Sequence, residues 1–279
     1  MQTQPAPSSV VNWAFTIPGM YVSASTTAAV FQHIQTFALN TSVIDGKLAF
    51  GVHLDGSSFG ISGTYLGDEA VFNETIAPAL LSGLPTPAST SIQSLDWISS
   101  LTLLAAPQPL EQPTTTYNLH DDFFAKSVVV PSSSPLTTEA LESYFGYIIE
   151  NGVNAPDPWF TIINLYGGPG SAINAIPSTA SAYSDRNALW VLQHYGFTAN
   201  TISPYPAASL DFVDGLNTAL TSAMPDTQFG AYLNYVDPSL SAAEAHELYY
   251  GEETYEKLVG IKNLVDPQHT FWNPQSIGN

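Results

Sequence analysis

Several residue types are scarce or missing, and each absence narrows what the chain can do. The 279 residues include no cysteine, which excludes disulfides, thiolate metal sites and cysteine nucleophiles. Five basic residues stand against 24 acidic ones, so nucleic acid and anionic membrane surfaces are poor partners. No run approaches the roughly 18 apolar residues of a transmembrane helix. The first nine residues, MQTQPAPSS, lack a basic start and an apolar core, so we expect no signal peptide, a disordered segment over 1–9 and a cytoplasmic location.

Metal ligation is also poorly supported. The six histidines are scattered, and none has a second histidine at ligand spacing together with a carboxylate motif. The one local cluster, His120-Asp121-Asp122, is better explained as part of a solvated loop. The sequence therefore predicts no metal site.

What the chain does have is material for a large core, with 14 Phe, 14 Tyr and 5 Trp. Apolar residues at three- and four-residue spacing predict helices over 26–40, 68–82, 91–105, 137–151 and 211–223, and two short helices near the C-terminus. Strand patterns flank Asp55-Gly56 as a hairpin and recur at 123–130, 159–166 and 188–197. Short strands joined by hairpins and helices indicate an α+β fold, an antiparallel sheet with helices on one face, spanning 10–236 and followed by a C-terminal helical segment at 237–279.

The glycine-rich stretch Gly167-Gly168-Pro169-Gly170 follows a strand-like run, as phosphate-binding loops do. It lacks the Lys-Ser/Thr of a P-loop and the spacing of a dinucleotide fingerprint. It also lacks the Gly-x-Ser-x-Gly pattern of a nucleophile elbow. The stretch by itself is typical of a strand that ends in a glycine turn where backbone passes close to a neighbour.

Four longer motifs carry more information. They are NLYGGPGSAIN (164–174), SAYSDRNALWVLQHYGF (181–197), AYLNYVDPSL (231–240) and LYYGEETYEKLVGIKNLVDPQHTFWNPQSI (248–277). In this order and spacing the chain resembles the C-terminal part of the berberine-bridge-enzyme-like flavoproteins. These are FAD-linked oxidases that act on alkaloids, sugars and other secondary metabolites. The strand-like FFAKSVVVP (123–131) is similar to a Lys-Ser strand of that family.

The resemblance implies a substrate-binding α+β domain over 10–236 and a berberine-like C-terminal segment over 237–279. It implies FAD as the family's cofactor, but the family's FAD-binding domain, with its covalently bonded His and often Cys, has no counterpart in the sequence. We therefore expect no cofactor in the isolated chain. We also expect its apolar surface to be covered by a separate flavin-domain chain or by a second copy in a homodimer.

Site residues can be carried over one at a time from the resemblance. Tyr235 matches the family's tyrosine base, Tyr232 a second pocket tyrosine, and Gln193 a polar residue placed against the substrate. Further positions would lie beside a flavin only if a flavin domain is supplied: Asn234, Gly167, Gly168 and Tyr250. The alternative is that Tyr232 and Tyr235 are half-buried strand aromatics.

The sequence departs from the family pattern at Val191, Asp185-Arg186 and His269, which leaves the ancestral proton chemistry open. Three functions therefore remain. The chain is the substrate-binding half of an FAD-linked oxidase for a small natural product, a cofactor-independent isomerase or cyclase, or a non-catalytic binding protein.

Overall fold

A computed structural model describes residues 5–111, 122–198 and 203–278. Residues 1–4 of the predicted disordered segment, and His120 and Asp121, lie outside the described residues. The described chain contains a seven-stranded sheet in the order β4-β1-β3-β2-β6-β7-β5, and every paired neighbour is antiparallel. The strands are β1 (Val10–Thr16), β2 (Leu48–Asp55), β3 (Phe59–Tyr65), β4 (Ser89–Leu95), β5 (Phe123–Pro131), β6 (Trp159–Leu165) and β7 (Ala188–Phe197). The predicted α+β class and its antiparallel sheet are confirmed.

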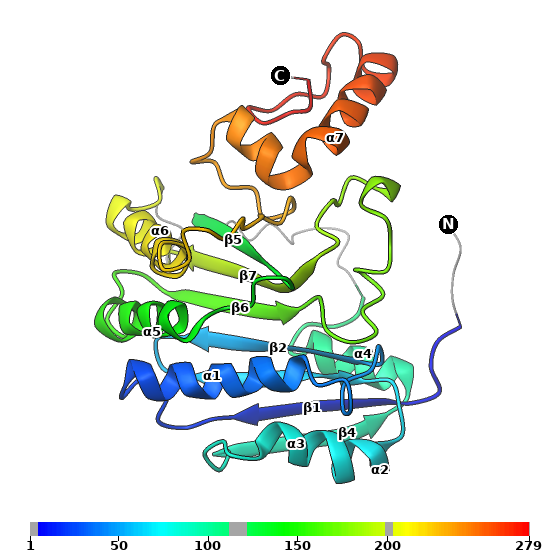
Figure 1. Cartoon of the computed structure of the whole chain (residues 1–279), viewed down its shortest axis with the longest axis vertical. Coiled ribbons are helices and arrows are strands. Elements are labelled where there is room, and N and C mark those ends of the chain that lie inside the picture. The colour runs from blue at the N-terminus through cyan, green and yellow to red at the C-terminus, as the bar shows by residue number, and fades with distance from the viewer. Residues whose placement is uncertain (1–4, 112–121, 199–202, 279) are drawn as a thin grey trace.

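Helices cover one face of this sheet, which we call the covered face (Figure 1). They are α1 (Ala24–Ala38), α2 (Glu69–Val71), α3 (Ala77–Leu81), α5 (Thr138–Tyr147) and α6 (Ala207–Thr221), with single π-helical turns at Phe72–Ile76 and Ile148–Gly152. A 3-10 turn at Ser178–Ala180 lies apart from them, in the loop between β6 and β7. α4 (Trp97–Ala105) is different, because the Ser100 hydroxyl donates to Asn12 Oδ1 on the opposite, open face of β1. The N-terminal caps follow the sequence, since Ser23, Asp96 and Thr137 accept backbone N–H groups from the first turns that they precede.

The helix predicted over 91–105 is wrong in its first five residues. Ser89–Leu95 forms β4, whose residues pair with the whole of β1, and the helix begins only at Trp97. The alternation Ser91-Ile92-Gln93 fits a strand, and the tertiary pairing with β1 decides the outcome. The hairpin at Asp55-Gly56 and the strands at 123–130, 159–166 and 188–197 are confirmed.

Alternation along the strands separates core from open face. Trp13, Phe50 and Trp190 point to the covered face, where their rings pack on one another and on Phe31 of α1. Gln35 of α1 joins helix, loop and sheet because its Oε1 accepts from Trp190 Nε1 and Leu136 N, at 3.1 and 3.0 Å. The core therefore lies between the sheet and α1, α5 and α6, and the intervening strand residues are left on the open face.

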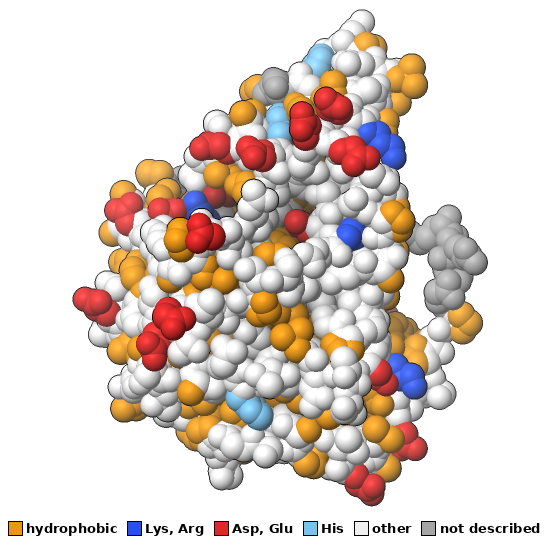
Figure 2. All heavy atoms as spheres, viewed as in Figure 1, with side chains coloured by type: hydrophobic (Ala, Val, Ile, Leu, Met, Phe, Trp, Pro, Cys, Tyr) orange, Lys and Arg blue, Asp and Glu red, His pale blue; other side chains and the backbone are white. Residues whose placement is uncertain are grey.

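The C-terminal segment extends beyond β5, at the end of the sheet (Figure 1). α7 (Ala242–Val265) begins with a capping box between Ser241 and Glu244 and is broken at Gly251, whose φ is 66°. The two short helices predicted there are thus present as the two parts of α7. Acidic side chains gather over this segment (Figure 2). No described helix is long and apolar enough to cross a membrane, and the described residues hold no group of three potential metal ligands.

Candidate functional site on the open face of the sheet

Four tyrosines from three separate parts of the chain meet on the open face, and we call them the tyrosine cluster. Tyr166 follows β6, Tyr183 precedes β7, and Tyr232 and Tyr235 follow α6. Tyr232 is central, with its ring centroid 4.9 Å from Tyr235, 5.9 Å from Tyr183 and 6.1 Å from Tyr166, each edge-on. Asn234 Nδ2 donates to the Tyr232 hydroxyl at 2.9 Å. The structure therefore brings three of the predicted residues, Tyr232, Asn234 and Tyr235, into one group.

The segment that carries these residues, 230–237, is not the strand that the sequence alternative expected. It forms one isolated bridge, from Gly230 to Val129 of β5, and then turns. Beyond the bridge, Tyr232 N donates to Ser127 Oγ at 2.8 Å, and the Asp237 carboxylate binds Lys126 at 2.9 Å. We call residues 230–237 the tyrosine segment. It is irregular because its polar groups are satisfied by β5 side chains and by its own turns.

Gln193 lies on the same open face, half-buried in β7. In the strand register it is directly opposite Ser127 of β5 and Ile162 of β6. Because Ser127 Oγ accepts from Tyr232 N, Gln193 and the tyrosine segment flank one residue of β5. The register thus places Gln193 next to the predicted tyrosines, and its role in binding remains a prediction.

Gly167 and Gly168 lie immediately after Tyr166, where the chain passes tightly against its neighbours. A Cβ on Gly167 would come within 2.3 Å of the Ala188 carbonyl oxygen, and one on Gly168 within 2.7 Å of that of Ala38. Gly168 also has a φ of 85°. Glycine is therefore needed here for close backbone packing that positions Tyr166, and a flavin-side role for these two residues stays untested.

Tyr250 is placed differently from the other predicted residues. It lies in α7, and its ring contacts are with Tyr249, His246 and Tyr255 of the C-terminal segment. The described contacts do not join it to the tyrosine cluster. Its flavin-side role also remains a prediction.

The cluster is a poor environment for phenolates. Burial, followed by the proximity of Tyr232, raises the pKa of Tyr166 to about 12. Burial and then Tyr232 also raise the pKa of Tyr235 above its ordinary value. At neutral pH both side chains are therefore phenols that can donate one hydrogen bond and accept others.

One carboxyl group lies beside the cluster. Asp185 packs against Gly230, where a Cβ would come within 2.8 Å of its Oδ1. Burial raises the pKa of Asp185 to about 6, and its Oδ2 has no hydrogen-bond partner among the described residues. The neighbouring Arg186 stacks on the Tyr183 ring, 4.9 Å from its centroid, and donates to Ile173 O and Ser181 Oγ.

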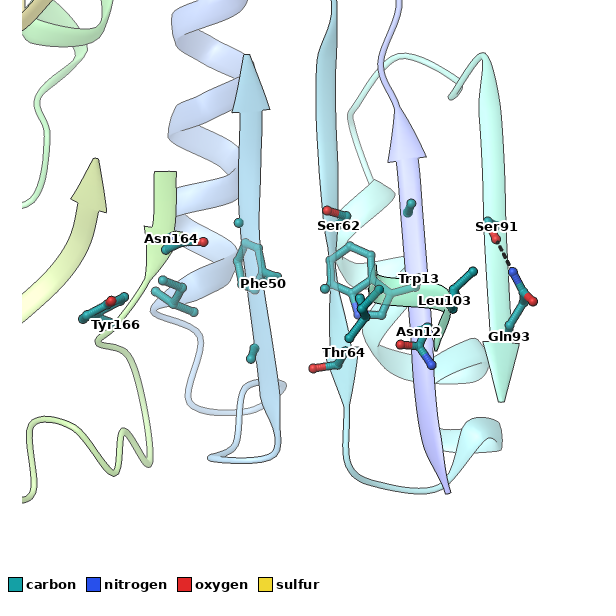
Figure 3. Close-up of a pocket in the computed structure, with 16 residues that line it drawn as sticks. Asn12, Trp13, Phe50, Ser62, Thr64, Ser91, Gln93, Leu103, Asn164 and Tyr166 are labelled. Atoms are coloured by element: carbon teal, nitrogen blue, oxygen red, sulfur yellow. Dashed lines mark hydrogen bonds between the residues drawn. The ribbon is translucent and has the colours of Figure 1, made fainter. Parts of the chain in front are cut away.

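A groove of about 510 Å³ extends from Tyr166 across the open face to β4 (Figure 3). We call it the polar groove. Its wall at one side is α4, through Leu103 and Leu104. Besides Tyr166, the polar side chains that line the groove come from four strands and are all uncharged: Asn12, Ser62, Thr64, Ser91, Gln93 and Asn164. Tyr166 belongs both to this groove and to the tyrosine cluster, so the two form a continuous surface.

Sequence reasoning missed Tyr166, Tyr183 and the polar groove. Tyr166 was readable as the residue between a buried strand and the glycine turn. The groove was not, because its residues are ordinary alternating strand positions whose neighbours depend on strand order. The misassignment of 91–95 as helix removed Ser91 and Gln93 from consideration.

The chain is similar to known proteins over nearly its whole length. Residues 231–278 match the family described as berberine and berberine like. The chain is 28% identical over 278 residues to a xylooligosaccharide oxidase of Thermothelomyces thermophilus, covering 99% of this chain and 54% of that protein. It is 30% identical over 233 residues to a chitooligosaccharide oxidase of Gibberella zeae, covering 82% of this chain and 45% of that protein.

Among solved structures, a glucooligosaccharide oxidase from Acremonium strictum superposes with a TM-score of 0.86 at 25% identity, over 99% of this chain and 57% of that one. It is described as carrying a 6-S-cysteinyl, 8α-N1-histidyl FAD. The chain spans about half the length of the curated relatives it matches. The chain belongs to the berberine-bridge-enzyme-like family of FAD-linked oxidases and is homologous to the substrate-binding half of its members.

Proposed function

We propose that this chain is the substrate-binding half of an FAD-linked oxidase and works together with a flavin-carrying domain that lies outside these residues. Its substrate is a small, uncharged metabolite that bears hydroxyl groups, and a carbohydrate is the leading candidate. The observation that carries the proposal is the continuity of the tyrosine cluster with an uncharged polar groove on one face of the sheet. The relatives named as oxidases of xylo-, chito- and glucooligosaccharides support the same substrate class.

The preference for a neutral substrate follows from the groove lining. Every lining side chain is uncharged at neutral pH, so a charged ligand would lose hydration without gaining an ionic partner. Amide and hydroxyl groups such as Asn12, Thr64 and Asn164 can each donate to and accept from sugar hydroxyls. The net charge of −19 adds a long-range repulsion against anions.

Tyr235 has the role of proton acceptor in this proposal. Oxidation of a hydroxyl group requires the loss of its proton, and a phenol can take that proton only as it gives up its own or as a phenolate. Burial and Tyr232 raise the pKa of Tyr235, so the phenolate is scarce at neutral pH. Tyr232, held by Asn234, is the nearest ring and can orient the Tyr235 hydroxyl and the substrate.

The chain's own residues do not fit FAD as a whole. A diphosphate needs cationic or backbone N–H donors, and the chain has only five basic residues. Lys126 and Lys262 are bound to carboxylates, and Arg186 and Lys257 donate to chain oxygens. The fifth, Lys47, is exposed in the turn before β2. We therefore assign the flavin to the partner domain and derive no step of its chemistry here.

Binding and reconstitution test the proposal separately. Saturation-transfer NMR on the chain alone should detect xylobiose and short chito- and glucooligosaccharides, with contacts that weaken in an Asn164→Leu variant. An acidic oligosaccharide is the matched negative control. Mixing the chain with the flavin-binding half of the xylooligosaccharide oxidase should give a heterodimer by light scattering and substrate-dependent hydrogen peroxide formation.

The variant Tyr235→Phe removes only the hydroxyl and should lower turnover at least tenfold, about 1.4 kcal/mol of barrier. Unchanged turnover would make Tyr235 a packing residue. Substrate conversion by the chain without any flavin would instead establish a cofactor-independent isomerase or cyclase. Tight binding without turnover in either setting would establish a binding protein, and a homodimer that excludes the flavin half would refute the partner assignment.

A further inference from the structure

The tyrosine segment is fastened to β5 at three successive points. Val129 and Gly230 exchange backbone hydrogen bonds of 2.8 and 3.0 Å. Ser127 Oγ then accepts from Tyr232 N at 2.8 Å. Finally, Lys126 Nζ binds Asp237 Oδ2 at 2.9 Å. The segment therefore runs along β5 in the direction opposite to the strand, as it does in Figure 1 between α6 and α7.

The last two fastenings lie on opposite faces of the sheet. Ser127 and Lys126 are consecutive strand residues, so their side chains point to opposite faces. Ser127 is on the open face beside Gln193, whereas Lys126 reaches Asp214 of α6 on the covered face, at 2.8 Å. Because β5 is the last strand of the sheet, the segment crosses this edge between Tyr232 and Asp237.

Between these two points the segment has no regular secondary structure. Tyr232 packs on the rings of Tyr166 and Tyr183, and Ala231 N donates to Leu248 O at 3.5 Å. Residues 231–236 form no helix or strand, and their local bonds are Tyr235 N to Tyr232 O at 2.9 Å and Asn234 to the Tyr232 hydroxyl. The side chain of Val236 is 56% exposed. Ser127 and Lys126 therefore fix the backbone of the segment to β5 at its two ends, and the ring contacts of Tyr232 add to these bonds.

We propose that Ser127 and Lys126 are positioning residues that hold Tyr232 and Tyr235 over the open face by fastening the two ends of the tyrosine segment to β5. Their importance for turnover rests on the proposed function, whereas the fastening itself does not. Both side chains are nearly removed from solvent, Ser127 at 8% and the Lys126 side chain at 12% exposure, so neither bond is easily replaced by water.

The two residues have separable effects. Ser127 contacts the segment only at Tyr232 N. Lys126 acts further along, because Asp237 also donates its N–H to the Tyr249 hydroxyl at 2.9 Å and accepts from Gln275 Nε2 at 2.7 Å. Loss of the serine hydroxyl should therefore free the Tyr232 end alone. Loss of the lysine should free the Tyr235 end together with the C-terminal segment.

Hydrogen exchange on the full chain, read by mass spectrometry without flavin or substrate, tests the fastening. In Ser127→Ala we expect at least tenfold faster exchange in peptides covering 230–236, whereas Ser127→Thr, which keeps the hydroxyl, should stay within about threefold of the parent. In Lys126→Met the faster exchange should include 237–240 and 270–278. If this variant does not fold, Asp237→Asn, which keeps Lys126 bound to Asp214, should give the same pattern.

Ser100→Ala is the matched control. It also removes the hydrogen bond of a buried serine hydroxyl, here to Asn12 of β1, at the end of the strand order opposite to β5. It should leave exchange at 230–236 unchanged. Equal acceleration there in Ser100→Ala and Ser127→Ala would reduce the effect to general loss of stability and overturn the proposal, as would parent-like exchange in Ser127→Ala.

Tyrosine ionisation, followed by ultraviolet difference absorbance, gives a second readout that a purely structural role would not move. Release of the Tyr235 end should expose Tyr235 and lower its pKa toward the ordinary value in Lys126→Met and Asp237→Asn, but not in Ser127→Thr or Ser100→Ala. An unchanged titration in both Lys126→Met and Asp237→Asn would overturn the positioning role of Lys126. A reconstituted enzyme that proves inactive would refute the proposed function. The hydrogen-exchange and titration results would still test the positioning role, because neither needs flavin or substrate.

Discussion

Acid should change the stability of this fold through two buried groups, His194 and Asp185, whose effects have opposite signs. His194 lies on the covered face, fully buried, with Nδ1 3.0 Å from Thr161 Oγ1 and with Nε2 unpaired among the described residues. Burial, and then the charge of Lys126, lower the pKa of His194 to about 3. Asp185 behaves in the opposite sense, because burial raises its pKa to about 6.

The signs follow from which state binds the proton more tightly. The unfolded chain protonates His194 near pH 6.5 and the folded chain only near 3, so stability falls as the pH drops through this window. For Asp185 the folded chain binds the proton first, so stability rises as the pH drops from about 6 toward the ordinary aspartate value. Each fully developed proton difference is worth about 1.4 kcal/mol per pH unit.

Between pH 6 and 4.5 these slopes oppose each other. Relative to the parent chain, His194→Asn should gain about 2 kcal/mol of unfolding free energy over this interval, because the destabilising protonation is gone. Asp185→Asn should lose about 1.5 kcal/mol over the same interval, because the stabilising one is gone. Asn is suited to position 194 because its side-chain amide can either donate to or accept from Thr161 Oγ1, the partner of His194 Nδ1.

Urea unfolding at each pH, fitted with a common m-value, measures the effect. The cavity left at position 194 costs the same at every pH, and all other titrating groups are shared with the parent, so only the difference curves matter. Difference curves that are flat for both variants would refute the assignment of these pKa shifts. Difference curves that rise for both variants, or fall for both, would refute the opposite effects predicted for His194 and Asp185.

Three further outcomes are expected. Gln35→Leu should lower the free energy of unfolding in urea by about 3 kcal/mol, because it leaves Leu136 N, Leu136 O and Trp190 Nε1 without their hydrogen-bond partner. Gln32→Leu, whose Oε1 has no partner among the described residues, should cost nothing; equal losses would contradict this account. In β3, Gly63→Ala should cost about 1–3 kcal/mol of unfolding free energy, because its Cβ would come within 2.1 Å of Ala49 O. Gly60→Ala is the control and should be tolerated, because the nearest atom to its Cβ lies at 3.9 Å. Equal melting temperatures for the two variants would contradict this expectation. Turnover by the reconstituted enzyme should still increase at pH 9, since the pKa of Tyr235 is raised, and a plateau near pH 7 would exclude Tyr235 as the titrating base.

The sequence predicted those parts of the fold that depend on local pattern. The Asp55-Gly56 hairpin, the apolar strand at 159–165 and the helix around Phe31 and Ile34 follow from periodicity and turn chemistry. The strand at Ser89–Leu95 did not, because its alternation is short and its exposed residues are held only by pairing with β1. Such pairing is a long-range property that no window of sequence contains.

The candidate site shows the same division. Tyr232, Asn234, Tyr235 and Gln193 were found through motifs. The structure groups the first three, and the strand register places Gln193 opposite Ser127, which accepts from Tyr232 N. Tyr183 was quoted within a motif but had no signal of its own, because its contact with Tyr232 depends on how two irregular segments meet. Tyr250 was placed beside the site by motif alone, and its ring contacts lie within the C-terminal segment instead.

The two margins of the sheet are protected unequally, and this bears on how the protein behaves in concentrated solution. β5 is covered by the tyrosine segment. Among the described strands β4 pairs with β1 alone, and its seven mostly exposed residues, STSIQSL, include no charge or proline to discourage further strand pairing. The restraint on edge-to-edge association must then come from the net charge of −19, which repels approaching copies. High salt, which screens that charge, and acid near the isoelectric point of about 4.2, which removes it, should therefore both favour growth of assemblies from the β4 margin. A lysine introduced at Ser91 would place a charge on that margin itself and make its protection independent of the rest of the molecule.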